Sequence, residues 1–363
     1  MNYYFHVPFC RSKCGYCAFY SEPSASRKAV GAYLDELERR LESGRPYERA
    51  ETIYIGGGTP TFLSAAQLER LFAMIRRELA PGPRCEITVE ANPETLDPAK
   101  VALLRGFATR ISLGVQSFDA ALRLRLGRRC SDAALATAIR LVREAGFPHW
   151  NCDLIYAIPG ESPAMWRRDL ERAAATGADH LSCYALTPEE GASLAVGFAV
   201  DDEAAAAGWL TAGKVLGECG FRRYEVSNYA RRGAECRHNL AVWRGGLLRS
   251  FGPSAADFDG KVRRTECASL RDWLNGVPPV VDAISAAARM AEIFAVNLRT
   301  VSGWTPARWR RVPGADSWRE RLAVAERAAA VTKRGYWHLS AERIALTGRG
   351  LLFWDSAAEA LLP

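Results

Sequence analysis

The chain lacks any apolar run that approaches 18 residues, and this excludes an ordinary membrane-spanning helix. Its first residues, Met1–Phe9, hold neither the basic segment nor the apolar segment of a secretory signal, so we expect a cytoplasmic protein. Low-complexity sequence is limited to Ala204–Ala207. A net charge of +7 over 363 residues is too small to favour a nucleic-acid partner, and we expect none.

Cysteine, in contrast, is present ten times. In a reducing compartment, cysteines serve more often as ligands or buried thiols than as a disulfide framework. Hydrophobic residues make up 48% and charged residues 25% of the chain, which is normal for a globular protein. The length allows two domains, or one large α/β barrel with an appendage.

The first 185 residues repeat a pattern of short apolar strand, polar or glycine-rich turn and amphipathic helix. The predicted strands are Tyr3–Val7, Thr52–Ile55, Glu86–Glu90, Arg110–Val115, Asn151–Ile155 and His180–Tyr184. The predicted helices are Arg27–Leu41, Ala65–Leu79, Pro98–Gly106, Ala133–Ala145 and Pro163–Thr176. This alternation indicates an α/β fold with a parallel sheet. Six units are too few for a complete eight-fold barrel, so we predict an open, partial barrel with its chemistry at the carboxyl ends of the strands.

The pattern changes at Asp201. A helix is predicted over Glu203–Cys219 and a strand around Arg223–Val226, followed by a loop-like stretch through Phe258. From Ala283 to Pro363 the sequence is mainly helical, with a short hairpin around Gly335–Leu346. We therefore predict a barrel domain over residues 1–200, an extension over 201–282 and a C-terminal domain over 283–363.

The strongest chemical signal follows the first strand, where Cys10, Cys14 and Cys17 form a C-x3-C-x2-C loop. A structural zinc ion normally has four protein ligands, and no fourth is obvious nearby. Three cysteines on a [4Fe–4S] cluster leave one iron without a protein ligand, where a small molecule can bind. The loop therefore favours an iron–sulfur cluster, with zinc or redox-active thiols as the alternatives.

Further polar and glycine-rich groups follow the other strands. Gly56-Gly57-Gly58-Thr59-Pro60 ends the second strand, and its glycines allow the backbone to approach a ligand closely. Glu90, Gln116 and Asp153 each lie at or just after the end of an apolar run. Because these positions share one end of the predicted sheet, they suit hydroxyl and amino groups of a ligand.

Taken together, these motifs resemble the radical S-adenosylmethionine (SAM) proteins. The match includes Glu90-Ala91-Asn92-Pro93, Gly114-Val115-Gln116-Ser117-Phe118 and Asp153-Leu154-Ile155-Tyr156-Ala157-Ile158-Pro159-Gly160. The resemblance implies a partial (β/α)6 barrel with a [4Fe–4S] cluster on the three cysteines and SAM on the open iron. By the same resemblance, the cofactor-binding residues are Tyr4, Tyr16, Gly57, Gly58, Thr59, Glu90, Gln116, Arg128 and Asp153.

Within that family, the chain resembles the branch of oxygen-independent coproporphyrinogen III oxidases and HemW heme chaperones. The oxidases carry a further cysteine where this chain has Phe19, and an N-terminal extension ahead of the cysteine loop, so both differences favour the chaperones. Cys236–Trp243 resembles the chaperone motif H-N-x-x-Y-W, which implies heme ligation by His238 and stacking on Trp243. Val242 and Ala256 depart from the chaperone pattern.

The resemblance implies a heme chaperone that binds heme and passes it to acceptor proteins, with an electron donor for its cluster. One alternative is an oxidoreductase that decarboxylates coproporphyrinogen III in porphyrin biosynthesis. A second is a non-radical binding module with a structural metal. The sequence leaves open whether the protein turns over a substrate, forms a homodimer or makes peripheral contact with a membrane.

Overall fold

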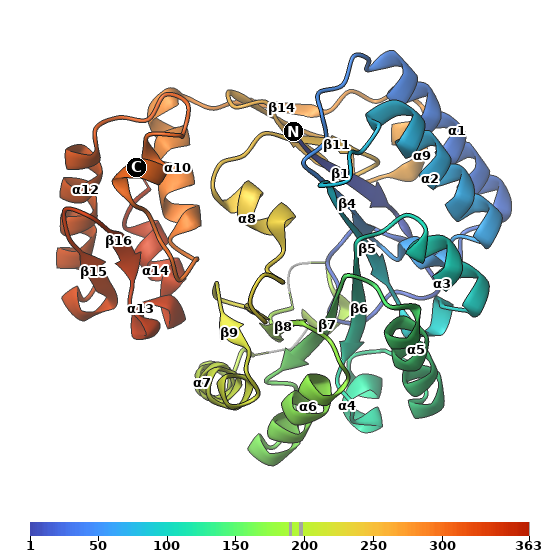
Figure 1. Ribbon diagram of the computed structural model, residues 1–363, viewed down its shortest axis with the longest axis horizontal. Coiled ribbons are helices and arrows are strands. Elements are labelled where there is room, and N and C mark those ends of the chain that lie inside the picture. Colours follow the sequence, from blue (N-terminus) through green and yellow to red (C-terminus); the bar gives the residue numbers. More distant parts are fainter. Residues whose placement is uncertain (189–190, 196–198, 363) are drawn as a thin grey trace.

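The computed structural model describes residues 1–188, 191–195 and 199–362, and its centre is a curved parallel sheet (Figure 1). Six strands stand side by side in chain order. They are β1 (Asn2–Val7), β4 (Thr52–Gly57), β5 (Glu86–Ala91), β6 (Arg110–Gln116), β7 (His149–Tyr156) and β8 (His180–Ala185). All six lie where the strand–helix pattern predicts them, and the expected open barrel is confirmed.

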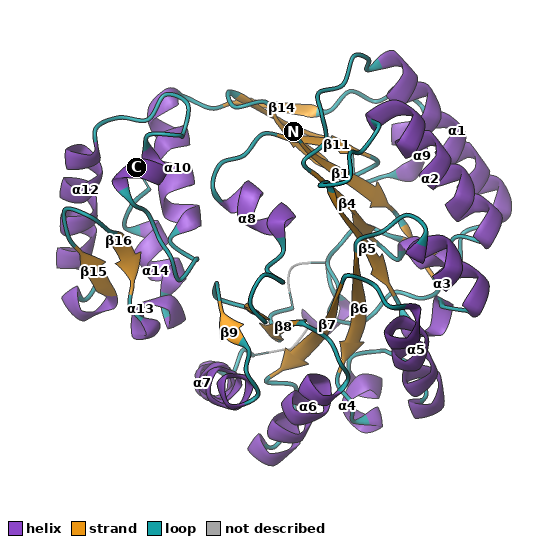
Figure 2. Cartoon of the chain, in the orientation of Figure 1, coloured by secondary structure: helices purple, strands orange, loops and turns teal. Residues whose placement is uncertain are grey.

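Helices cover the outer face of this sheet (Figure 2). They are α1 (Arg27–Ser43), α2 (Ala65–Leu79), α3 (Pro98–Arg105), α4 (Ala120–Arg125), α5 (Asp132–Ala145) and α6 (Pro163–Ala175). Their starts are capped as expected: Ser64 forms a capping box with Gln67, and the Asp97 side chain accepts from the Lys100 amide. Ile53 and Ile55 of β4 belong to the core, whereas Tyr54 between them faces a cavity inside the barrel. This alternation leaves a polar barrel interior.

The sheet extends beyond the six strands at both edges. Among the described residues it has twelve strands in the order β14-β13-β12-β11-β1-β4-β5-β6-β7-β8-β10-β9. The added strands are β9 (Arg222–Arg223), β10 (Asn228–Ala230), β11 (Leu248–Phe251), β12 (Ala256–Phe258), β13 (Val262–Thr265) and β14 (Val280–Ala283). Strand β11 runs parallel to β1, with Leu248 opposite Asn2.

The prediction of a loop-like stretch through Phe258 is therefore wrong. That stretch contains α8 (Arg237–Trp243), β11 and β12, after α7 (Asp202–Glu218). The predicted strand around Arg223–Val226 is present only as β9 and lies one residue earlier. Strand β11 is four residues long and is stabilised by pairing with β1, about 245 positions earlier, so its local sequence carries little strand signal.

The remaining short elements complete the barrel side of the chain. They are β2 (Phe9–Cys10), β3 (Glu22–Pro23), α9 (Leu270–Leu274) and the 3-10 turns Pro60–Phe62, Pro93–Thr95 and Ser193–Ala195. Helix α8 lies inside the curve of the sheet (Figure 1), and its His238 amide donates to Glu86 at the start of β5. The amino-terminal ends of the central strands are thereby closed by α8.

The C-terminal region is mainly helical, as predicted. It contains α10 (Ala286–Asn297), α11 (Pro306–Trp309), α12 (Trp318–Val331), a 3-10 turn (Arg334–Tyr336), α13 (Gly348–Leu352) and α14 (Trp354–Glu359). A hairpin of β15 (Trp337–Leu339) and β16 (Ile344–Leu346) lies where one is expected. Trp304 and Trp309 are buried against Phe294 and form its core. The mainly helical region is predicted to begin at Ala283. In the structure Ala283 is the last residue of β14, and helix α10 begins at Ala286.

This region joins the barrel through a buried ion pair. Arg299 donates to the fully buried Glu225 at 2.8 Å, and its guanidinium packs on Trp243 and Trp354. The division at residues 200 and 282 stays a prediction, and Pro363 lies outside the described residues. Within the described part of the chain, no helix is long and apolar enough to cross a bilayer.

Candidate functional site

A cavity of about 520 Å³ opens at the carboxyl ends of the barrel strands and continues inward to α8. This volume lies within the range of about 300–1,000 Å³ that small-molecule sites occupy. Twelve of the thirteen predicted site residues line it. They are Tyr4, Cys10, Cys14, Tyr16, Cys17, Gly57, Gly58, Thr59, Glu90, Gln116, Arg128 and Asp153.

The cysteine loop is held against the barrel at two points. The Gly15 amide donates to the Leu126 carbonyl at 3.0 Å, and the Cys10 sulfur lies 3.6 Å from the Thr59 hydroxyl. Burial raises the pKa of the Cys14 thiol, an effect that the nearby Arg128 partly offsets, and burial also raises the pKa of the Cys17 thiol. As free side chains these two thiols are therefore protonated at neutral pH, and a bound metal must displace their protons.

The donor set fits a cluster better than a single ion. Among the described residues, no three His, Cys, Asp or Glu side chains are close enough to hold one metal ion. Thiolates on different irons of a cluster lie farther apart than the ligands of one ion, because each binds its own iron. Three thiols around one cavity suit that wider spacing.

The glycine turn after β4 packs too tightly for side chains. Gly57 has φ of +104°, and a Cβ there would lie 2.7 Å from Nδ1 of His6. A Cβ on Gly58 would lie 2.7 Å from the Phe9 carbonyl oxygen. Both glycines are therefore required by close contact with β1 and the start of the cysteine loop, and their bare backbone faces the cavity.

Two carboxyl groups face the cavity from β5 and β7, which are separated in the sheet by β6. Glu90 accepts from the Tyr54 hydroxyl at 2.7 Å and from the Gly57 amide at 3.2 Å. Burial raises the pKa of Glu90 to about 7, and the nearby Asp153 adds to this rise. Asp153 accepts from Ser112 and Asn151, but burial is the larger effect and raises its pKa. These groups can accept hydrogen bonds from ligand hydroxyls or pair with a ligand cation.

Arg128 links the floor of the cavity to the cysteine loop. Its guanidinium donates to the Gly114 carbonyl at 2.9 Å and to the Tyr16 hydroxyl at 3.3 Å. Gln116 ends β6 with φ of +69°, next to an irregularity in the β6–β7 register. A non-glycine residue in this conformation is uncommon and is often found at functional sites.

His238 is the one predicted site residue that does not line the cavity. Its Nδ1 lies 2.8 Å from the Thr52 hydroxyl, which itself donates to Asn2. A hydroxyl has a single proton, so Nδ1 carries the imidazole proton and Nε2 keeps its lone pair. Burial lowers the pKa of His238 to about 4, and the ring is neutral at pH 7. The neighbouring Asn239 does face the cavity.

Sequence reasoning missed several residues that line the cavity. They are Tyr54, Ser112, Gly114, Tyr184 and Asn239. Ser112 and Gly114 alternate with Gln116 along β6, so a two-residue count back from Gln116 would have found them. The same count from Gly57 on β4 reaches Ile55 of the core, and β8 carries no predicted site residue, so Tyr54 and Tyr184 had no such signal. Phe19 also lines the rim, with 69% of its surface exposed.

Residues 4–173 match the family model described as Radical SAM superfamily. The chain is 36% identical over 377 residues to the heme chaperone HemW of Mycobacterium tuberculosis. The alignment covers 99% of this chain and 94% of that protein. It is 34% identical to the heme chaperone HemW of Escherichia coli, with 73% of each chain covered. The solved structure of coproporphyrinogen III oxidase (HemN) from Escherichia coli, a radical SAM enzyme, superposes with a TM-score of 0.86. That match covers 99% of this chain and 89% of the enzyme at 21% identity, so it shows the shared fold alone.

Proposed function

Because the chain belongs to the radical SAM superfamily and, within it, to the HemW heme chaperones, we propose that it binds heme and transfers it to acceptor proteins in the cytoplasm. The observation that carries this proposal is the convergence of twelve predicted residues on one cavity in a chain that matches a heme chaperone along nearly its whole length. The proposal requires a heme site and a cluster site. It also requires an acceptor protein for heme and an electron donor for the cluster.

The cluster site comprises Cys10, Cys14 and Cys17. The SAM site comprises the nine predicted residues of the same cavity, which are Tyr4, Tyr16, Gly57, Gly58, Thr59, Glu90, Gln116, Arg128 and Asp153. Bound together, a [4Fe–4S] cluster and SAM supply one-electron reductive chemistry at the cavity. Glu90 would accept hydrogen bonds from the ribose hydroxyls of SAM, and Arg128 holds Tyr16 beside the cysteine loop. The bare turn at Gly57 and Gly58 leaves space for the amino acid portion of SAM.

For heme, we propose two positions that an experiment can separate. The first is His238, whose Nε2 has the lone pair and whose neutral ring is the form that binds iron. The residue is only 6% exposed, so ligation requires α8 to shift from β4. The second is the cavity rim, where Phe19 and the partly exposed Tyr184 offer aromatic faces to a planar ligand.

The test is an anaerobic heme titration of the reconstituted protein, followed by the Soret band. Wild type is expected to shift the band. His238→Gln removes the lone-pair nitrogen, and a change of the bound spectrum locates the iron at His238. Weaker binding by Phe19→Ser with an unchanged spectrum locates the ring at the rim. Absence of any shift in wild type would contradict heme binding.

The same preparation separates the chaperone from an oxidase. Incubation with SAM, a reductant and coproporphyrinogen III is expected to give no decarboxylated porphyrin. Appearance of protoporphyrinogen would overturn the chaperone proposal. Transfer of heme from the loaded protein to an apo-hemoprotein, followed by the acceptor's own absorbance, tests the delivery step.

A further inference from the structure

A positively charged surface surrounds the short helix α4 on the outside of the barrel. In Figure 1, α4 lies between α5 and α6. Leu124 on this helix has 64% of its surface exposed, although it is apolar. Arg125 ends the helix and Arg129 follows it, and both are exposed. We call Leu124, Arg125 and Arg129, together with the pocket described below, the α4 face.

The turn between Arg125 and Arg129 of the α4 face touches the backbone of the cysteine loop. The Gly15 amide donates to the Leu126 carbonyl at the end of α4. Gly127, the next residue, is exposed, and a Cβ placed on it would lie 2.9 Å from the Gly15 nitrogen and 3.7 Å from Cα of Cys14. The exposed turn after α4 thus packs closely on the backbone next to Cys14, a residue that we assign to the cluster.

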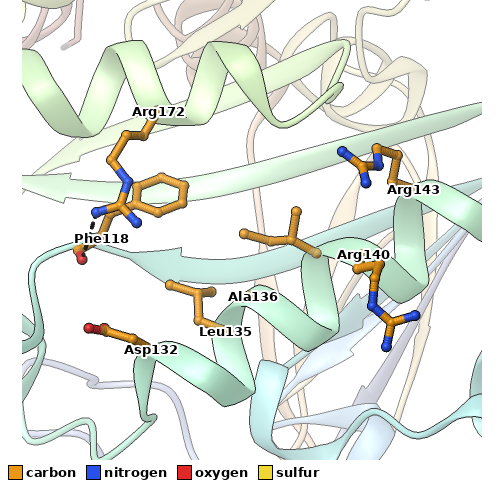
Figure 3. A pocket seen from close by; sticks show the side chains of 8 residues that line it. Phe118, Asp132, Leu135, Ala136, Arg140, Arg143 and Arg172 are labelled. Carbon is orange, nitrogen blue, oxygen red and sulfur yellow. Dashed lines mark hydrogen bonds between the residues drawn. The ribbon is translucent and has the colours of Figure 1, made fainter.

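A small pocket near α4 is also lined by arginines. Its volume is about 220 Å³, and Figure 3 shows it between α5 and α6. Leu135 and Ala136 form an apolar floor, and Arg140, Arg143 and Arg172 surround it. The Arg172 guanidinium packs on the Phe118 ring, 4.7 Å from its centre, and donates to the Phe118 carbonyl.

Two acidic groups beside these arginines are already paired, whereas Asp119 at the start of α4 accepts only from the backbone amides of Ala121 and Leu122. Asp132 binds the buried Arg123, and Glu144 binds Arg140. Among the described residues, Arg143 and Arg172 form no ion pair. The α4 face therefore keeps uncompensated positive charge around an apolar centre, and this suits a partner with an acidic rim.

We propose that the α4 face is the docking surface for an acidic electron-carrier protein that reduces the cluster. This inference rests on the proposed function, because it requires the cluster at Cys10, Cys14 and Cys17. One electron leaves the carrier, which is oxidised by one step, and enters the cluster, which is reduced by one step. Electron-transfer encounters use small interfaces of less than about 1,200 Å², and opposite charges speed their association.

The experiment compares two reductants on the anaerobically reconstituted protein. The rate of cluster reduction is measured as the loss of the cluster's visible absorbance. It is measured with reduced flavodoxin, an acidic flavoprotein, and separately with dithionite, a small reductant that needs no docking surface. We expect Arg129→Glu and Leu124→Ser each to slow reduction by flavodoxin about tenfold at low salt. Their dithionite rates should match wild type. Arg327→Glu on the exposed side of α12 is the matched control and should leave both rates unchanged.

Salt provides a second readout. The wild-type flavodoxin rate should fall steeply with ionic strength, and the Arg129→Glu rate should fall less, because one attractive charge is lost. Equal flavodoxin rates in wild type and both α4 variants would overturn the inference. So would an equal slowing with flavodoxin and dithionite, since that indicates a disturbed cluster. A wild-type protein that dithionite cannot bleach would instead overturn the cluster assignment, and the docking surface with it.

Discussion

Glu90 gives the clearest link between the cofactor cavity and stability. Its carboxyl has an ordinary pKa of 4.5, and burial raises the pKa in the folded protein to about 7. Below pH 4.5 the carboxyl is protonated in both states, so folding has no penalty. Between pH 4.5 and 7 the unfolded chain loses the proton first, and the folded state becomes less favourable. Above pH 7 the full penalty remains, about 3 kcal/mol at about 1.36 kcal/mol per pKa unit.

The variant Glu90→Gln removes this penalty and keeps the side-chain shape. Its amide oxygen can still accept from Tyr54, but its NH₂ then faces the Gly57 amide, which costs about 1 kcal/mol. The net gain at pH 8 is about 2 kcal/mol. For 363 residues and about 2.1 cal/mol/K of unfolding entropy per residue, this corresponds to a rise in Tm of about 3 °C.

The assay is thermal unfolding of the protein without cluster or SAM, at pH 5 and pH 8. We expect Glu90→Gln to raise Tm at pH 8 and to change it little at pH 5. As the control, Glu171→Gln on the exposed side of α6 should change Tm by the same small amount at both pH values. A Tm difference between Glu90→Gln and wild type that does not vary with pH would refute the argument. In the reconstituted protein, Glu90→Gln should weaken SAM binding about 10- to 100-fold, measured by calorimetry.

Three further changes test other parts of the structure. Replacing all of Cys10, Cys14 and Cys17 with alanine should abolish the four irons and four sulfides expected per chain, measured by chemical analysis. Gly57→Ala places a Cβ 2.7 Å from His6 at a φ of +104°, so both Tm and cluster retention should fall, whereas Gly217→Ala, with no neighbour within 4 Å, should raise Tm slightly. Arg299→Ala leaves the buried Glu225 unpaired and should cost about 3 kcal/mol in chemical denaturation; an unaltered midpoint would contradict the importance of this pair.

The strand–helix pattern of the sequence was sufficient to predict most strands and helices of the barrel. Each central strand, such as β4 with Ile53 and Ile55, carries apolar residues toward helices that follow it directly in the chain, so local periodicity contains the signal. Strand β11 depends on pairing with β1 instead, and its four residues, which include the half-buried Arg249, are too few to show such a periodicity. Non-local pairing is therefore what the sequence pattern could not reveal.

The candidate site divides in a similar way. The cysteine loop and the strand-end residues converge because parallel strands end at one edge, and this geometry follows from the fold class. His238 differs because its position depends on how α8 packs inside the sheet, where Thr52 binds its Nδ1. A motif fixes which residue is present, whereas tertiary packing decides which cavity it faces.

The place of β1 in the sheet has a consequence for biosynthesis. Strand β1 pairs on one side with β4, which is complete at Gly57, and on the other side with β11, which is complete only at Phe251. At roughly 5–20 residues per second, the ribosome needs roughly 10 to 50 seconds to proceed from Cys17 to Phe251. During this interval the β11 edge of β1, the strand that leads into the cysteine loop, has no partner, although Thr59 and Leu126, which hold the loop, are made before β11. The order of synthesis thus creates a period in which all three cysteines are made while the strand that carries them is paired along one edge only.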